Sequence, residues 1–245
     1  MTFMPKVLRL MREKGTEFKG GFVSTPICCP SRSSILTGMY VHNHNVHTNN
    51  HNCSGEEWRK DHEHRSIGVY MQEAGYRTAY LGKYLNEYEG DYVPPGWEYW
   101  LGLVKNSKFY NYTVNFNGKR LKYGADYEKM MFNIIQDYFT DLVTNHSVKF
   151  LEDHFLNYND VPFLLVISYP APHGPEDPAP QYSDLFEDID SHRTESWNYA
   201  PNPDKQWLLQ RTGKMEPVHV AFTDLLHRRR MQTLQSVDEG VHQKT

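Results

Sequence analysis

The sequence predicts an α/β fold with a mainly parallel sheet and helices on both faces. Strand-like and helix-like segments alternate along the chain, which is the pattern of a layered α/β protein. The segment 162–169 (PFLLVISY) is a continuous apolar run, as expected for a parallel strand that is buried on both faces. Because the 245 residues are 39% hydrophobic and 23% charged, we expect one folded domain with a sizeable core.

Apolar residues at helical spacing, and the residues that end each run, indicate five helices. They are predicted at residues 4–14, 31–37, 65–74, most of 127–157, and 216–238. Gly15, Gly38 and Gly75 follow the first three, because glycine readily takes the left-handed conformation that ends a helix. Pro30 precedes the second helix, where its fixed φ suits a first turn.

Short strands are predicted between these helices, at residues 22–24, 76–81 and 162–169. A hairpin is predicted over 110–122, because Asn117-Gly118 is the strongest short turn signal. Residues 170–205 hold many Pro, Asp and Ser residues and predict a long loop. In open parallel sheets ligands bind beyond the carboxyl ends of the strands, so the candidate site is expected at those ends.

Charge and composition narrow the class of protein. The formal net charge of -4, from 26 basic and 30 acidic side chains, argues against nucleic-acid binding. The longest basic run, Arg228–Arg230, predicts a solvated helix face. No apolar run approaches the roughly 20 residues of a membrane span, and residues 1–15 indicate an amphipathic helix, not a signal peptide. The sequons at Asn52, Asn111 and Asn145 nevertheless predict a glycosylated, secreted parent protein whose start is missing here.

The three cysteines are the first candidates for chemistry. Cys28, Cys29 and Cys53 allow one disulfide and leave at least one thiol over. Cys28 and Cys29 precede the N-terminus of a predicted helix, a position that stabilises a thiolate or a bound anion. Arg32 lies four residues after Cys28, so one helical turn can return its guanidinium to the same site. The alternative is that both cysteines are inert buried thiols.

Two further polar side chains follow other predicted strands. Lys83 comes directly after the strand 76–81 and Gly82, and His173 lies between prolines after the strand 162–169. Because the strand ends should converge, Cys28, Arg32, Lys83 and His173 are predicted to hold a tetrahedral anion beside a nucleophile. The alternatives are a solvated lysine and a histidine that caps a backbone carbonyl.

A histidine-rich run suggests a zinc site as another possibility. Its candidate ligands are His42, His44, His47, His51 and Cys53. The spacing matches no standard zinc pattern, and the cysteines are too few. A polar loop on the substrate side is therefore the favoured interpretation.

Residues 28–32, Cys-Cys-Pro-Ser-Arg, with Leu-Thr-Gly at 36–38, resemble the sulfatase signature Cys-x-Pro-Ser-Arg and its trailing Leu-Thr-Gly. Further stretches are similar to the extracellular endosulfatases that remove 6-O-sulfate groups from heparan sulfate, with the N-acetylglucosamine-6-sulfatases next nearest. These stretches are 40–46, 82–88, 94–97 and 171–177. The resemblance covers almost the whole chain and implies a partial alkaline-phosphatase-like sulfatase fold.

The resemblance implies a role for each residue of the predicted pocket. Cys28 would be converted to formylglycine by the formylglycine-generating enzyme in the endoplasmic reticulum, and the hydrated aldehyde would attack sulfur with one hydroxyl and expel sulfate with the other. Arg32 would support the formylglycine and the metal, Lys83 would bind the sulfate, and His173 would contact the sulfate or the leaving oxygen. Many sulfatases carry a His two residues after the Lys; Leu85 stands there, which leaves the second-step base open.

Substrate contacts are expected outside this pocket as well. His42, His44 and Asn86 belong to two of the matching stretches and are expected to bind substrate. The implied parent protein passes through the endoplasmic reticulum and Golgi to the cell surface or the extracellular space. Its implied partners are heparan sulfate proteoglycans.

The resemblance also implies one calcium ion, held in part by the formylglycine at position 28. The other ligands are expected in an N-terminal metal-binding strand and a C-terminal metal-binding segment that this chain lacks. Residues 1–245 are therefore expected to be an incomplete sulfatase catalytic domain, inactive or nearly so by itself. The alternatives are an inactive glycan-binding or regulatory module, and a phosphatase-like anion-transfer enzyme, against which the Pro-Ser-Arg context argues.

Overall fold

A five-stranded mixed sheet, in the order β4-β3-β2-β1-β5, forms the centre of the protein. The computed structural model describes residues 2–50, 52–124 and 137–243. The strand β1 (Arg77–Lys83) pairs in parallel with β2 (Tyr99–Leu103) and with β5 (Phe163–Ser168). The hairpin of β3 (Thr113–Phe116) and β4 (Lys119–Lys122) continues the sheet antiparallel to β2. The predicted α/β fold is confirmed, and its three parallel strands are adjacent.

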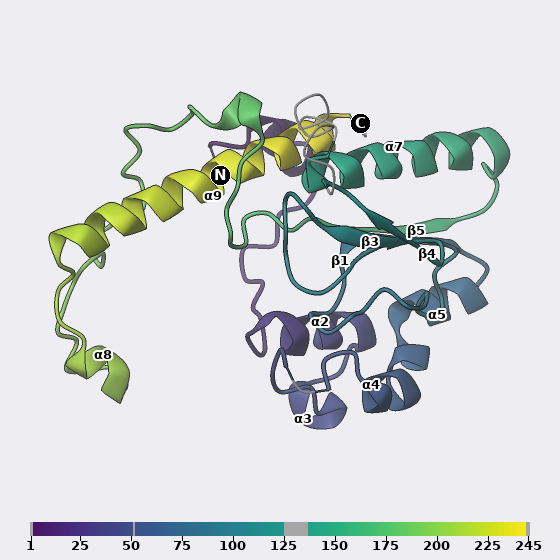
Figure 1. Ribbon diagram of the computed structural model, residues 1–245, viewed down its shortest axis with the longest axis horizontal. Coiled ribbons are helices and arrows are strands. Elements are labelled where there is room, and N and C mark those ends of the chain that lie inside the picture. The colour runs from purple at the N-terminus through teal and green to yellow at the C-terminus, as the bar shows by residue number, and fades with distance from the viewer. Residues whose placement is uncertain (1, 51, 125–136, 244–245) are drawn as a thin grey trace.

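Helices cover both faces of the sheet (Figure 1). The long helices α7 (Phe139–Asn157) and α9 (Pro217–His242) lie on one side. On the other side lie α2 (Cys28–Thr37), α4 (Glu56–Asp61) and α5 (Ile67–Glu73). This arrangement sandwiches the sheet between two helical layers, as predicted.

The central strand β1 divides the hydrophobic core in two, because successive side chains of a strand point to opposite faces. Tyr80 packs into an aromatic cluster with Trp58, Tyr84 and Trp100. Leu81 joins the opposite cluster, which contains residues of α7. All seven residues of β1 are buried, so the strand is fixed from both sides and its last residue, the predicted lysine, has a defined position.

The remaining elements are short. They are α1 (Pro5–Val7), η1 (Leu8–Arg12), α3 (Val41–His44), η2 (Glu63–Arg65), η3 (Pro180–Tyr182) and α8 (Trp207–Arg211). The first two form the helix predicted near the N-terminus. No helix within the described ranges combines the length and apolar character needed to cross a membrane.

Several local predictions need correction. Residues 22–24 form no strand: Phe22 and Val23 are 94% and 69% exposed, so no neighbouring element covers their apolar side chains. Strand β2 was not predicted, and neither were α3 and α4. Helix α2 begins three residues earlier than expected, because proline is tolerated in a first turn. Of the predicted helix over 127–157, residues up to 136 lie outside the described residues.

Strand β5 also differs from its prediction. Its six residues are half-buried, whereas the apolar run predicted burial on both faces. Within the described residues β5 pairs with β1 alone, so it lies at the edge of the sheet. Burial depends on neighbouring strands as well as on the sequence of a strand, which is why the apolar run overestimated it.

Candidate active site

The structure brings Cys28, Lys83 and His173 to one point beyond the carboxyl ends of β1 and β5. Cys28 is the first residue of α2, and its thiol is not part of a disulfide. The Lys83 Nζ atom lies 3.4 Å from Cys28 Sγ. The Nε2 atom of His173 lies 3.7 Å from the same sulfur. A cation and an imidazole therefore flank the side chain of residue 28, as the convergence of strand ends predicts.

Arg32 joins this group from the next turn of α2. One guanidinium nitrogen, Nη1, donates at 2.8 Å to the backbone oxygen of Lys83 and at 2.8 Å to Ser168 Oγ. Ser168 is the last residue of β5, so Arg32 connects the ends of two neighbouring strands. Both acceptors are neutral, and the positive charge of Arg32 therefore contributes to the field around Cys28.

Lys83 is almost completely buried, and among the described residues its ammonium group has one hydrogen-bond partner besides the sulfur. Its Nζ donates to Asn106 Oδ1 at 2.8 Å. Burial lowers the pKa of Lys83, the sulfur of Cys28 opposes this change, and the positive charge of Arg32 adds to it. Sequence reasoning missed Asn106, which follows β2, and Ser168. A polar residue just beyond a parallel strand is a candidate for the site, but Asn106 was not recognised as one because β2 had not been predicted.

The hydrogen bond at the other ring nitrogen fixes the orientation and tautomer of His173. Nδ1 lies 2.7 Å from the backbone oxygen of Gly174. A carbonyl oxygen accepts only, so Nδ1 must donate, and Nε2 of the neutral ring is left as an acceptor directed at Cys28. His173 thus makes both contacts that the sequence suggested: one ring nitrogen binds a backbone carbonyl and the other faces the side chain of residue 28. This tautomer suits a general base.

A disulfide anchors the start of α2. Cys29 pairs with Cys53, with their Cα atoms 5.6 Å apart, and both are fully buried. The backbone N–H of Cys29 donates to Asn49 Oδ1 at 2.9 Å. Cys29 is therefore structural and forms the one disulfide that three cysteines allow, while the adjacent Cys28 is half-buried beside polar groups. The two cysteines have different environments despite their adjacency.

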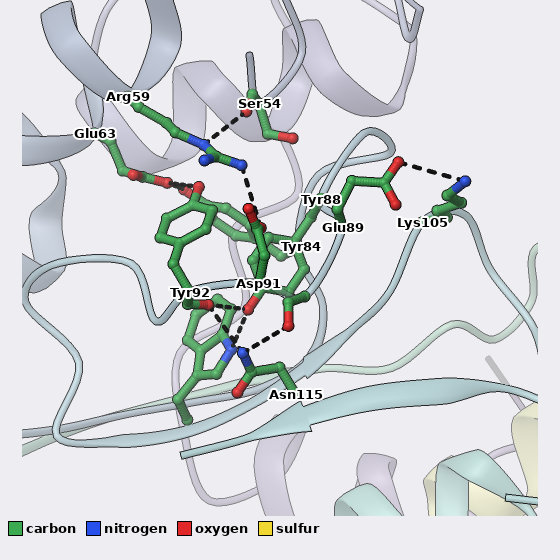
Figure 2. Close-up of polar contacts among 12 residues, drawn as sticks. Ser54, Arg59, Glu63, Tyr84, Tyr88, Glu89, Asp91, Tyr92, Lys105 and Asn115 are labelled. Atoms are coloured by element: carbon green, nitrogen blue, oxygen red, sulfur yellow. Dashed lines mark hydrogen bonds and ion pairs between the residues drawn. The ribbon is translucent and has the colours of Figure 1, made fainter. Parts of the chain in front are cut away.

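A buried polar network holds the segment that follows Lys83 (Figure 2). The hydroxyls of Tyr84 and Tyr92 both donate to Glu63 Oε1, at 2.9 and 2.7 Å. The Arg59 guanidinium lies over the ring of Tyr92, 4.0 Å from its centroid. Burial raises the pKa of Glu63, while hydrogen bonds from Tyr92 and Tyr84 oppose that change. These contacts keep the residue next to Lys83 in place.

Two of the residues predicted to bind substrate lie near the surface. His42 is exposed and stacks on the ring of Tyr40, with centroids 5.8 Å apart. Asn86 is half-buried, and its backbone N–H contacts both sulfurs of the Cys29–Cys53 disulfide. Neither makes a hydrogen bond to the group around Cys28 in the described part of the chain.

The third, His44, is fully buried. Its Nδ1 accepts from the backbone N–H of Val46 at 3.1 Å, so Nε2 donates to Ser34 Oγ at 3.0 Å. Burial lowers the pKa of His44, as does the nearby His62. This placement makes His44 part of the interior between α2 and α3, away from any surface that a substrate could reach.

The sequons differ in accessibility. Asn111 and Asn145 are exposed, which is compatible with a glycan on each. Asn52 is half-buried, and its side-chain amide donates to Glu57. Glycosylation at these three positions stays a prediction.

Metal binding has little support among the described residues. No group of three or more His, Cys, Asp or Glu side chains is placed to hold a metal ion within them. Cys53, a candidate zinc ligand, is used by the disulfide, and His51 lies outside the described residues. The groups around Cys28 are cations, an imidazole and neutral oxygens, which do not fit the oxygen-rich ligand set of calcium. We therefore derive no chemical step through a metal.

The fold, the cysteine at a helix start and the cations around it together define a sulfatase. The chain matches the sulfatase family over residues 2–243 and belongs to that family. It is 70% identical over 241 residues to the Sulf-1 homolog of Caenorhabditis elegans, which covers 98% of this chain and 33% of that protein. It is 41% identical over 251 residues to N-acetylglucosamine-6-sulfatase of Homo sapiens, covering 98% of this chain and 44% of that protein.

These relatives confirm the predicted order of resemblance, with extracellular sulfatases first and N-acetylglucosamine-6-sulfatases next. The chain thus spans less than half the length of either relative. A protein solved in complex with its substrate D-glucosamine-2-N,6-O-disulfate has the same fold, with a TM-score of 0.63 over 98% of this chain and 56% of that one. At 20% identity this likeness concerns the fold alone.

Proposed function

We propose that the parent protein removes 6-O-sulfate groups from glucosamine units of heparan sulfate, at the cell surface or outside the cell. The observation that carries this proposal is the meeting of Lys83 and His173 at the side chain of residue 28, 3.4 and 3.7 Å from its sulfur. The similarity to Sulf-1 homologs and to N-acetylglucosamine-6-sulfatases supports the choice of substrate. Heparan sulfate proteoglycans would be its partners.

In this proposal Cys28 is converted to formylglycine by the formylglycine-generating enzyme. The hydrated aldehyde supplies two hydroxyls on one carbon, so that one can attack sulfur and the other can later expel sulfate. An unmodified cysteine has a single thiol and no second group on the same carbon, so it would leave the sulfate attached. The free, half-buried state of Cys28 and its position between two polar side chains support this residue as the modified one.

The other residues act on charge and protons. Lys83 and Arg32 offset the negative charge of the sulfate. This stabilisation is strongest where water is partly excluded. In the second step His173 Nε2 accepts the proton of the remaining hydroxyl, the carbonyl of the aldehyde re-forms, and the oxygen–carbon bond to the sulfate breaks so that sulfate leaves. The fixed tautomer supports His173 as this base, and the fully buried Leu85 has no part in it.

Calcium remains part of the proposal for the parent protein only. It would neutralise further charge on the sulfate, with ligands from outside residues 1–245 apart from the modified residue 28. We accordingly expect the isolated chain to be inactive or nearly so. The alternative function is that this chain binds sulfated glycans without turning them over.

The test uses this chain secreted from animal cells. Mass spectrometry of the peptide that contains Cys28 should show an aldehyde in place of the thiol. Isothermal titration calorimetry should show binding of glucosamine 6-sulfate that Lys83→Ala abolishes. Lys105→Ala is the matched control, because Lys105 lies on the surface in an exposed ion pair with Glu89 and should leave binding unchanged.

The outcomes separate the two functions. Binding with an aldehyde and slow release of sulfate supports the enzyme, and binding without turnover supports the glycan-binding module. An unmodified thiol in the secreted chain would count against the formylglycine step. If Lys83→Ala and Lys105→Ala bind the sugar equally, the pocket assignment is refuted.

A further inference from the structure

A cavity of about 580 Å³ opens beside the catalytic group. Arg32, Ser107 and residues 169–174, which include His173, form most of its lining. The remaining lining residue, Arg230, comes from helix α9, far away in the sequence. The helix therefore brings a second guanidinium to a cavity that shares Arg32 and His173 with the group around Cys28.

A tether holds Arg230 at this position. Its Nε and Nη2 atoms both lie 3.2 Å from the same carboxylate oxygen, Oε1 of Glu176. The Glu176 side chain is 12% exposed, whereas that of Arg230 is 51% exposed. The buried carboxylate thus fixes one side of the guanidinium, and Nη1 stays outside the ion pair. A planar guanidinium with donors to spare is well suited to an anionic oxygen.

The lining of this cavity carries positive charge. It contains two guanidinium groups and one imidazole, and no acidic side chain belongs to the lining. Arg32 donates to neutral oxygens, so its charge is uncompensated by them. Arg230 is offset by one carboxylate that lies behind it. A ligand with a single sulfate would use Lys83 and Arg32 and leave Arg230 paired with Glu176 alone.

We propose that Arg230 determines specificity by binding a second anionic group of the substrate, next to the sulfate that is cleaved. This inference rests on the proposed function and assigns it a substrate class: glucosamine 6-sulfate units that carry another anion nearby. That anion can be an N-sulfate on the same sugar or the carboxylate of a neighbouring uronate. The neighbours Arg228 and Arg229 do not line the cavity, which separates Arg230 from the rest of the basic run.

The competing role for Arg230 is positioning. Glu176 belongs to the loop of His173, and its backbone N–H donates to the His173 backbone oxygen at 3.2 Å. Breaking the ion pair could therefore shift the imidazole and weaken every ligand alike. Glu176→Gln tests this role, because it weakens the tether while the guanidinium stays in the cavity.

The experiment is a calorimetric comparison of three probes with the secreted chain. They are glucosamine 6-sulfate, glucosamine 2-N,6-O-disulfate, and a disaccharide of uronate and glucosamine 6-sulfate. The wild-type chain should bind at least one of the two dianionic probes about three- to tenfold more tightly than the monosulfate, as one half-exposed charge-assisted contact provides. Which of the two gains identifies the source of the second anion.

Arg230→Ala should remove this preference and leave the affinity for glucosamine 6-sulfate unchanged. Arg228→Ala, which removes the same charge from the same helix, should keep the preference, and so should Glu176→Gln. Equal weakening of all three probes by Arg230→Ala and by Glu176→Gln would overturn the inference in favour of positioning, and a wild-type chain without preference would overturn it outright. Binding that does not depend on Lys83 would instead refute the proposed function.

Discussion

Substitution of Gly82 by alanine should destabilise the end of the sheet at which the candidate site lies. Gly82 precedes Lys83 in β1 and has a φ of +117°, where an L side chain costs about 1–2 kcal/mol. An added Cβ would lie 2.0 Å from the backbone oxygen of Ser168, whereas ordinary contact begins at 3.4 Å. Residues 82 and 168 are paired across β1 and β5, so neither backbone can move without disturbing the register.

The expected loss of stability is the sum of the backbone strain at residue 82 and the cost of displacing Ser168. Forcing extra volume into a packed site typically costs about 1–3 kcal/mol, so Gly82→Ala should destabilise the protein by roughly 2–5 kcal/mol in total. The displaced residue is Ser168, whose hydroxyl accepts from Arg32. Binding of glucosamine 6-sulfate should therefore weaken together with stability.

Urea unfolding followed by the fluorescence of the five tryptophans measures this loss. Gly118→Ala is the matched control, because Gly118 has a φ of +88° but nothing lies within 4 Å of its added Cβ. The control should lose only the strain, about 1–2 kcal/mol. Equal losses for the two variants would refute the argument that the close approach of β1 and β5 requires glycine.

Two further predictions concern buried groups. Burial raises the pKa of Glu63 above its ordinary value of 4.5, so the folded state binds this proton more tightly than the unfolded state, and the residue lowers stability as the pH rises. The stability of Glu63→Gln relative to wild type should therefore increase from pH 4.5 through the raised pKa, and a pH-independent difference in urea midpoints would contradict it. Replacing both Cys29 and Cys53 by serine should cost about 3 kcal/mol for a loop of 24 residues; an unchanged midpoint, or a non-reducing peptide map with Cys28 in the bridge, would show that the pairing is incorrect.

The parts of the site that could be predicted are those set by local sequence. Lys83 and His173 follow apolar runs that end in Gly or Pro, so their positions at strand ends follow from chain order and from the geometry of parallel sheets. Cys28 and Arg32 are related by one helical turn, a distance that the sequence also determines. Their convergence requires only that the two strands be neighbours.

The parts that could not be predicted depend on tertiary contacts. Asn106 follows the short strand β2. Because β2 was not predicted from the sequence, Asn106 could not be placed at the end of a strand. His44 resembled a polar loop residue, but it is buried and hydrogen-bonded to Ser34 of a neighbouring helix. Arg230 belonged to a basic run that predicted a solvated face, and its relation to the cavity follows from how α9 crosses the loop after β5.

The two hydrogen bonds of Arg32 limit which substitutions the site can accept at this position. One nitrogen of its guanidinium ties the backbone of residue 83 to the side chain of residue 168, so the same group supplies charge and sets the spacing of two strand ends. Lysine could keep the charge but not the forked geometry of a guanidinium. The charge of Arg32 and its structural role therefore cannot be changed separately, and an anion that binds at this site would meet a guanidinium already held in place by two hydrogen bonds.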